Sequence, residues 1–264
     1  MLGLGLSFWA GSALTALPNE GGGGFSPASL FASGESGVWY DPSDLSTLWA
    51  DTFGTTQAVL GGAVARMDDK SGNGNHVTQD TFAARAILRQ SVAGEYYLEF
   101  DGVDDYLLTA AGILGGAATV FTLAAGVSTE GGAGTSGNDR PLSLGNATLG
   151  TAGGSARETF GQAQDGSLRY DGAFTAGALS LPSEFVRLSS RNGGSVLDMI
   201  NAAESIGATA TLVSTIDEVA ICAPAGAAYA QANIHGVIVI NRVLTAQEIS
   251  DTETYLAEKA GVTL

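Results

Sequence analysis

A long series of short strand-like runs, with no helical pattern between them, extends from about residue 58 to residue 242. In the run 118–128, apolar side chains alternate with small or polar ones, which is typical of a half-buried strand. Asp-Gly pairs, which favour tight turns, punctuate the series at 101–102, 165–166 and 171–172. The series therefore predicts an all-β chain folded as an antiparallel sandwich of two sheets. The predicted strands lie within 85–90, 96–100, 105–110, 118–128, 140–145, 167–174, 184–191, 214–223 and 233–243.

The composition fits such a domain and excludes two classes of partner. The chain has 264 residues, of which 38 are glycine, and its 45% hydrophobic residues suffice for a large core. A net charge of −16 with only 11 Lys and Arg leaves no basic footprint for a phosphate backbone or an anionic membrane. We therefore expect neither nucleic acid nor membrane as a partner. An acidic surface suits a neutral or cationic partner, such as a glycan.

The chain ends in one clear helical pattern, TAQEISDTETYLAEKAG, at residues 245–261. Thr245 and Glu248 have the spacing of a capping box, and Gly261 is suited to the C-terminal cap. We expect the apolar stripe of this helix to pack across the edge of the sandwich. The stripe consists of Ile249, Thr252, Leu256 and Ala260.

The first 37 residues differ from the rest, because they are apolar without a sustained period and are cut by four consecutive glycines at 21–24. Such a segment cannot fold alone, so we expect it to lie on a surface of its own domain or of a neighbouring subunit, and we favour the neighbouring subunit of a homo-oligomer. The residues expected to attach it are Leu2, Leu4, Leu6, Phe8 and Trp9. The segment lacks the basic region of a signal peptide, which indicates synthesis in a cytoplasm.

A short docking helix is predicted next, in the stretch YDPSDLSTLW at 40–49, with Asp41 as its cap and Asp44 in its first turn. Three parts follow from these patterns. They are an extended attachment segment with a glycine-rich linker at 1–37, a short helix and connector at 38–57, and one β domain with its terminal helix at 58–264.

Three stretches occur in an order that resembles the laminin-G-like, concanavalin A-like jelly-roll lectins. DKSGNGNHVTQ (69–79) precedes YYLEFDGVDDYLLT (96–109), and IDEVAI (216–221) leads to GVIVINRVLTAQEISDTETYL (236–256). The resemblance covers about residues 60–256 and implies a jelly-roll sandwich. A Trp-His pair that often opens a middle strand of these lectins is not matched, since Phe185 stands at the nearest position.

A second resemblance covers the first hundred residues. GGGGFSPASLFASGESGVWYDPSDLSTLWAD, followed by the SGNGN loop, is similar to structural proteins encoded by bacteriophages and prophages of proteobacteria. In those proteins a lectin-like domain follows a short attachment segment. The resemblance implies a virion protein, such as a tail fibre, tail-tip or head appendage, that contacts host surface glycan or decorates the particle. It also implies the virion as its location.

The stretches that carry the lectin resemblance contain the candidate sugar-binding side chains. Amide and carboxylate groups beside an aromatic ring are the usual elements of a sugar site. The candidate ligand-binding residues are Asn73, Asn75, His76, Asp104, Asp105 and Tyr106. Aromatic rings available as platforms, which are also suited to a core, are Trp39, Tyr40, Tyr106, Tyr170 and Phe174. The glycines at 72 and 74 equally fit a tight connecting loop with no ligand.

The stretch EFDGVD contains Glu99, Asp101 and Asp104, which approach the carboxylate spacing of glucanases that share the jelly-roll fold. Gly102 interrupts that spacing, because it favours a turn before Asp104, and the aspartates also suit turn capping. We therefore predict no catalytic residues and a chain that is not an enzyme. Two alternatives stay open: a glycoside hydrolase acting on bacterial surface polysaccharide, and a structural adaptor that binds protein rather than glycan.

No cofactor and no metal site are predicted from the remaining polar residues. Some relatives in the lectin family bind calcium at a rim loop, but a full set of its ligands is not matched here, so structural calcium is left as an open alternative. His235 lies in the apolar run NIHGVIVI and is expected to be a hydrogen-bonded core or edge residue. Cys222, the single cysteine, is expected in the core.

Overall fold

The computed structural model describes most of the chain from Gly24 onward. The described residues are 24–110, 112–115, 120–128, 138–145, 157–163, 168–170, 173–174, 184–192, 195–209, 218–222 and 229–264. The predicted attachment residues between Leu2 and Trp9 and the Asp-Gly pairs at 165–166 and 171–172 lie outside these ranges. Attachment through the N-terminal segment therefore stays a prediction, as does the three-part division of the chain.

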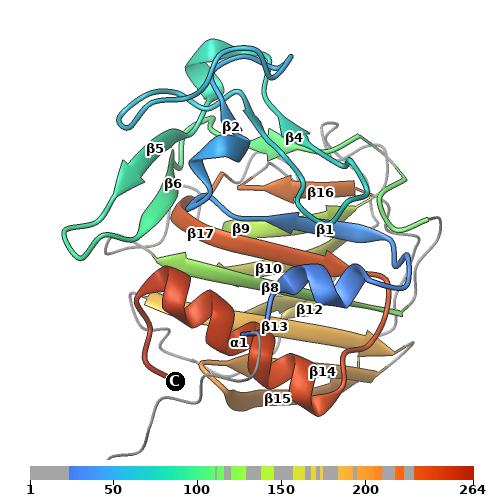
Figure 1. Ribbon diagram of the computed structural model, residues 1–264. Helices are drawn as coiled ribbons and strands as arrows, with labels where there is room; N and C mark the ends of the chain where they lie inside the picture. The colour runs from blue at the N-terminus through green and yellow to red at the C-terminus, as the bar shows by residue number, and fades with distance from the viewer. Residues whose placement is uncertain are drawn as a thin grey trace, which may run out of the picture.

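Two antiparallel sheets form the body of the molecule (Figure 1). The first, called here the helix-bearing sheet, has the order β15 (Ala203–Thr209), β14 (Ser195–Ile200), β13 (Glu184–Asn192), β8 (Val120–Ser128), β17 (Gln231–Ile240), β6 (Tyr96–Asp101) and β5 (Ile87–Gln90), with β1 (Gly37–Tyr40) also paired to β17. The second, called the opposite sheet, has the order β12 (Ala173–Phe174), β11 (Leu168–Tyr170), β10 (Arg157–Ala163), β9 (Asn138–Gly145), β16 (Glu218–Ile221), β7 (Leu107–Leu108), β4 (Val77–Thr78), β3 (Arg66–Met67) and β2 (Leu48–Trp49).

The predicted fold class, an all-β antiparallel two-sheet sandwich with a C-terminal helix, is confirmed. The main core lies between the sheets, where inward side chains of both interdigitate. Its members include Val38, Tyr40, Leu48, Met67, Leu98, Phe100, Phe121, Leu123, Val219, Ile221, Ile234 and Val239. Cys222 is buried in this core, as expected. No helix among the described residues is both long and apolar enough to cross a membrane.

The predicted half-buried strand at 118–128 is wrong in one respect, because β8 is buried on both faces. Phe121 and Leu123 face the opposite sheet, whereas Ala124 packs on the other side against a second apolar cluster. That second cluster joins the sheet to the C-terminal helix and to the 3₁₀ helix η1 (Pro27–Phe31). The small or polar residues of the alternation therefore lie beneath these helices rather than in water.

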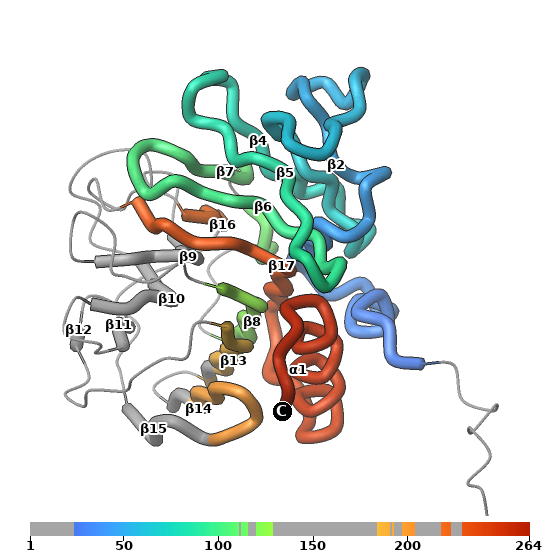
Figure 2. Tube along the Cα trace, turned by 90° about the vertical axis from the view of Figure 1, so that its left-hand side faces the viewer, coloured from blue at the N-terminus to red at the C-terminus, as the bar shows by residue number. Residues whose placement is uncertain are grey.

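The C-terminal helix α1 (Ala246–Ala260) has the predicted capping box of Thr245 and Glu248 and ends at Gly261 in the left-handed conformation. It lies over the outer face of β8, β13 and β17, not across the sandwich edge as expected (Figure 2). Two glycines opposite each other in β8 and β17 allow this. A Cβ at Gly126 would lie 3.0 Å from the backbone oxygen of Leu256, and one at Gly236 would lie 2.9 Å from a methyl of the same leucine.

The predicted docking helix at 40–49 is also wrong. The segment forms β1, the single 3₁₀ turn η2 (Leu45–Thr47) and β2, and Asp44 rather than Asp41 caps the turn. Strand pairing outweighs helical propensity here, because β1 adds to β17 with both faces covered. A side chain at Gly37 would not fit, since its Cβ would lie 2.0 Å from the backbone oxygen of Val239.

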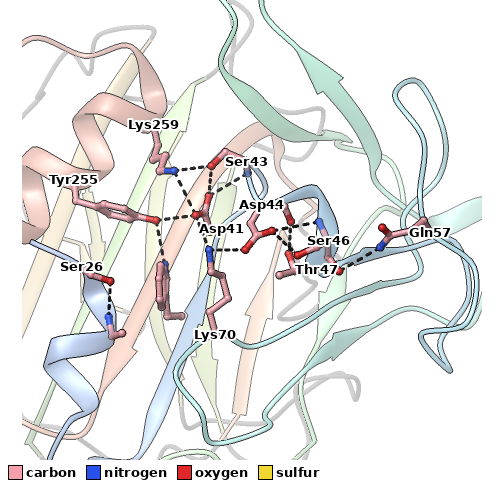
Figure 3. A network of polar contacts seen from close by, with 12 residues as sticks. Ser26, Asp41, Ser43, Asp44, Ser46, Thr47, Gln57, Lys70, Tyr255 and Lys259 are labelled. Carbon is pink, nitrogen blue, oxygen red and sulfur yellow. Dashed lines mark hydrogen bonds and ion pairs between the residues drawn. The ribbon is translucent and has the colours of Figure 1, made fainter. Parts of the chain in front are cut away.

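Asp41 is free for another role, and it joins three distant parts of the chain (Figure 3). It is 4% exposed, and its Oδ2 accepts a hydrogen bond from the Tyr255 hydroxyl at 2.9 Å. The same oxygen lies 3.0 Å from Nζ of Lys70 and 3.3 Å from Nζ of Lys259. Its Oδ1 accepts from the Ser43 hydroxyl at 2.6 Å. One carboxylate thereby ties β1 to the loop after β3 and to the last turns of α1.

Replacing this carboxylate is expected to destabilise the fold. Burial by itself raises the pKa of Asp41. Hydrogen bonds from Ser43 and the charges of Lys259 and Lys70 outweigh this effect, so the pKa of Asp41 lies below its ordinary value. The network therefore stabilises the protein above the unfolded-state pKa of about 3.9 and loses that contribution as the pH falls through the folded pKa. We expect Asp41→Asn to lower the free energy of unfolding by about 2 to 3 kcal/mol at neutral pH, measured by urea denaturation.

The matched control is Asp80→Asn, which removes a carboxylate at an exposed position. It should change the free energy of unfolding by less than about 0.5 kcal/mol. Equal effects of the two substitutions would contradict the role given to Asp41.

Candidate functional site

The SGNGN loop is folded around its own aspartate. Asp69 accepts hydrogen bonds from the backbone N–H of Trp39 at 3.0 Å, of Ser71 at 2.9 Å and of Asn75 at 3.0 Å. His76 accepts one from the backbone N–H of Asp69 at 3.1 Å through Nδ1. The glycines at 72 and 74 have φ of 92° and 75°, which confirms the predicted tight loop.

The two loop asparagines are engaged with β1. The side-chain amides of Asn73 and Asn75 donate to the backbone oxygen of Gly37 at 3.2 and 3.0 Å, and Asn73 also donates to that of Glu35 at 3.1 Å. The Tyr40 hydroxyl donates to the backbone oxygen of Asn75. These contacts hold β1 against the loop and engage the amide N–H groups of both asparagines, whose predicted role in sugar binding stays a prediction.

The acidic turn after β6 has the predicted capping geometry. Gly102 has a φ of 75°, and Asp101 accepts from the backbone N–H of Val103 at 2.8 Å. Asp105 is 5% exposed and accepts from the backbone N–H of Asp101 at 3.1 Å. Carboxylate oxygens of Asp101, Asp104 and Asp105 lie within 4.8 Å of one another, a separation that could hold a cation. Every contact described for these oxygens is explained by the turn itself.

The structure does not bring the two predicted groups of ligand residues together. Strand β4, which follows the SGNGN loop, pairs antiparallel with β7, which follows the acidic turn. The loop with Asn73, Asn75 and His76 and the turn with Asp104 therefore lie beyond opposite ends of this strand pair. Tyr106 follows the turn, and the centroid of its ring lies 6.4 Å from that of the Tyr229 ring.

Two of the predicted aromatic platforms belong to the core. Tyr40 is fully buried, and Trp39 is 8% exposed with its Nε1–H donated to the Tyr255 hydroxyl at 3.2 Å. Tyr106 is half-buried. The side chains of Tyr170 and Phe174 lie outside the described part of the chain.

A pocket that the sequence did not signal opens on the outer face of the helix-bearing sheet. It has a volume of about 390 Å³ and lies between the tip of the β5–β6 hairpin and the end of α1. We call it the hairpin pocket. It is lined by Ser91, Val92, Ala93, Glu95, Tyr97, Ser128, Glu184, Asn233, His235, Ala260 and Gly261. Five separate parts of the chain contribute to it: the hairpin, the end of β8, the start of β13, β17 and the C-terminal cap of α1.

His235 forms one wall of the pocket and is held in a single orientation. It is 4% exposed, and its Nδ1 lies 3.1 Å from the backbone oxygen of Lys259, which can only accept. Nδ1 therefore carries the proton, and Nε2 accepts from the Ser128 hydroxyl at 3.0 Å. Burial lowers the pKa of His235 to about 4, so the ring is neutral at physiological pH. The predicted hydrogen-bonded histidine is confirmed.

Tyr97 presents a half-buried ring to the same pocket, with its centroid 5.3 Å from that of His235. Two carboxylates flank it. Glu95 accepts from the Ser91 hydroxyl, and this hydrogen bond lowers the pKa of Glu95, so it is ionised at neutral pH. Glu184 is exposed at the start of β13. The pocket thus combines an aromatic face with acceptors for hydroxyl or ammonium groups.

A shallower depression of about 230 Å³ continues from the hairpin pocket along β6 and β17. Asn233 lines both, and Glu99, Asp101 and Gln231 line the depression. Arg89 pairs with Glu99 at 2.7 Å beside it. Alternation explains this polar strip, because Leu98 and Phe100 of β6 point into the core. Glu99 between them and Asp101 after them point outward and line the depression.

The chain is similar to solved structures of β-sandwich proteins, whereas no family model and no curated protein matches it. A Trypanosoma rangeli sialidase bound to 2,3-difluorosialic acid has a TM-score of 0.58 at 14% identity, over 96% of this chain and 36% of that one. Domain 4 of an extracellular arabinanase from Geobacillus stearothermophilus, in complex with arabinotriose, has a TM-score of 0.51 at 13% identity, over 83% of this chain and all of that one. A structure of botulinum neurotoxin type C, whose cell entry depends on two ganglioside molecules, has a TM-score of 0.53 at 11% identity, over 84% and 51%.

These similarities support the two-sheet β-sandwich fold and correct one prediction. The expectation that the chain is not an enzyme is wrong as an inference from the fold, because sialidases, which are enzymes, are among the matched structures. The chain spans about a third of the length of those sialidases. None of the three structures described is a bacteriophage protein, so the virion part of the resemblance stays a prediction.

The acidic turn makes stability depend on pH. Burial, with the charges of Asp101, Asp104 and Glu99, raises the pKa of Asp105 to about 7. Between about pH 4 and pH 7 the folded protein therefore holds a proton that the unfolded chain has lost, so this group's contribution to stability falls as the pH rises. Asp105→Asn should remove that slope. Because solvent reaches part of the site, we expect a gain on the order of 1 to 2 kcal/mol at pH 8 relative to pH 4.5.

Urea denaturation at several pH values, with the difference between variant and wild type plotted, measures this effect. Asparagine keeps an oxygen that can accept from the Asp101 N–H, so the variant preserves the turn. A difference that does not change with pH would contradict the assignment to Asp105.

Proposed function

We propose that the chain is a carbohydrate-binding β-sandwich domain that takes a sugar in the hairpin pocket. The observation that carries this proposal is the placement of the Tyr97 ring beside Glu95 and Asn233 in one open pocket. An aromatic face packs against the apolar side of a sugar ring, while carboxylate and amide groups bind its hydroxyls. The sugars named for the arabinanase domain and the neurotoxin add support by analogy of fold.

Substitution of Tyr97 tests the location of the site. A glycan array first identifies the sugar, and titration calorimetry then measures its affinity for each variant. We expect Tyr97→Ala to weaken binding about tenfold, since the lost ring contact is equivalent to about 1.4 kcal/mol. The matched control is Tyr106→Ala, which removes a half-buried tyrosine beside the acidic turn. Loss of binding in the control but not in Tyr97→Ala would move the site to the turn.

Glycoside hydrolysis in the same pocket is a second candidate, because Glu95 and Glu184 both line it. Glycosidases use two carboxyl groups, one as acid and one as nucleophile or base. The ionised Glu95 fits the second of these roles. Mass spectrometry of an oligosaccharide incubated with the protein distinguishes the candidates. Shortened products that disappear in Glu95→Gln support hydrolysis, and intact oligosaccharide contradicts it.

We extend the proposal to the location and partners of the domain. In this extension the chain belongs to a phage particle that is assembled in a bacterial host. Residues 1–37 attach it to other virion subunits, and its β-sandwich contacts host surface glycan. The resemblance of the first hundred residues to phage structural proteins supports it. An antibody against the domain should label purified particles from an induced host. Labelling of cell fractions without particles would contradict the extension.

A further inference from the structure

The hairpin pocket is negatively charged. Of the described residues that line it, Glu95 and Glu184 are carboxylates and none is Lys or Arg. The C-terminal cap of α1 forms another wall, and the backbone carbonyls at a helix C-terminus carry a partial negative charge. A ligand that enters this pocket therefore meets acceptors of negative potential from the hairpin, from β13 and from the helix.

Among the residues that the structure describes, the nearby groups that could offset this charge are engaged or neutral. Arg89, directly across from Tyr97 in the β5–β6 pair, lies 2.7 Å from a carboxylate oxygen of Glu99. Lys259 lies in the last turn of α1, but its Nζ lies 2.6 Å from the Ser43 hydroxyl and 3.3 Å from Oδ2 of Asp41. Its ammonium is thus used in the Asp41 network (Figure 3). The buried His235 ring is neutral, with both nitrogens in hydrogen bonds. No described residue of the pocket lining is a cation that offsets the two carboxylates, so their charge acts on a ligand.

The aromatic ring of Tyr97 favours a positively charged group in the pocket over a neutral polar group. A positively charged nitrogen is attracted to the face of an aromatic ring, and the attraction adds to that of a nearby carboxylate. The half-buried Tyr97 ring lies in the pocket with Glu95 and Glu184. An ammonium group on a sugar can meet the ring and a carboxylate together, whereas a sugar carboxylate would be repelled.

We propose that the hairpin pocket binds sugars that carry a free amino group, and that it rejects acidic sugars such as uronic and sialic acids. The inference rests on the proposed carbohydrate-binding function and adds the class of sugar. Neutral sugars of the same shape are bound more weakly, because they keep the ring contact and the hydroxyl contacts but lack the ammonium.

Three trisaccharides with different charges test this inference. They are β-1,4-linked glucosamine, its fully N-acetylated form, and a trimer of galacturonic acid. Calorimetry with the full chain at about pH 6, where the sugar amines are protonated and His235 is neutral, measures the affinities. We expect the N-acetylated form to bind roughly tenfold more weakly than the amino form, and the acidic trimer to show no binding. Moderate salt suppresses the non-specific attraction due to the net charge of −16.

Variants assign the preference to the pocket. Glu184→Gln and Glu95→Gln should each reduce the affinity ratio between the amino and N-acetylated trisaccharides by about threefold or more. Glu184 is exposed, so its substitution should leave thermal unfolding unchanged. The matched control, Asp80→Asn, removes the same charge at an exposed position outside the pocket lining and should leave the ratio unchanged.

The outcomes separate this inference from the proposed function. Equal or tighter binding of the N-acetylated or acidic trimer overturns the preference for amino sugars and leaves carbohydrate binding standing. If the pocket takes another sugar backbone, a glycan array with acetylated and deacetylated forms decides, and hits confined to acetylated or acidic forms overturn the inference. Absence of binding to every glycan overturns the proposed function and the inference with it.

Discussion

The carboxylate of Asp41 is the interaction on which the arrangement of the outer layer depends. It is buried, and one of its oxygens meets two lysines and a tyrosine hydroxyl that come from both halves of the chain. A buried charge is tolerated only when opposite charges and hydrogen bonds surround it. The position of Lys259 and Tyr255 is therefore coupled to that of β1. Because both belong to the last turns of α1, the same network fixes the end of the helix that forms a wall of the hairpin pocket.

Glycines in the strands beneath α1 and in β1 also contribute to this arrangement. Gly126 and Gly236 lie opposite each other in β8 and β17, and their missing side chains let α1 lie directly on the sheet. Near the other end of β1, Gly37 offers its carbonyl to the amides of Asn73 and Asn75. The SGNGN loop thus acts as a support for β1, and β1 carries Asp41 toward the helix. The loop that looks most like a ligand site in the sequence supports β1, and through this chain of contacts it bears on the hairpin pocket.

The parts of the fold that sequence predicted are those determined by local pattern. Strand-like runs predicted β6 and β17, alternation predicted β8, and the spacing of Thr245 and Glu248 predicted the start of α1. The stretch at 40–49 was mistaken for a helix, since its turn-forming residues resemble a helix start and nothing local shows that β17 lies beside it. The pocket could not be predicted, because its walls come from residues as far apart as Ser91 and Gly261. His235 was recognised as a satisfied histidine, but its position in a cavity depends on the packing of α1.

The central claim is that a sugar binds on the outer face of the helix-bearing sheet, between Tyr97 and the end of α1. A crystal structure of the full chain soaked with the tightest-binding oligosaccharide tests it most directly. The account predicts one sugar ring stacked on Tyr97, with a polar group of the sugar within hydrogen-bond distance of Glu95 or Glu184. Ordered sugar at the SGNGN loop or at the acidic turn, with the hairpin pocket containing only water, would contradict it.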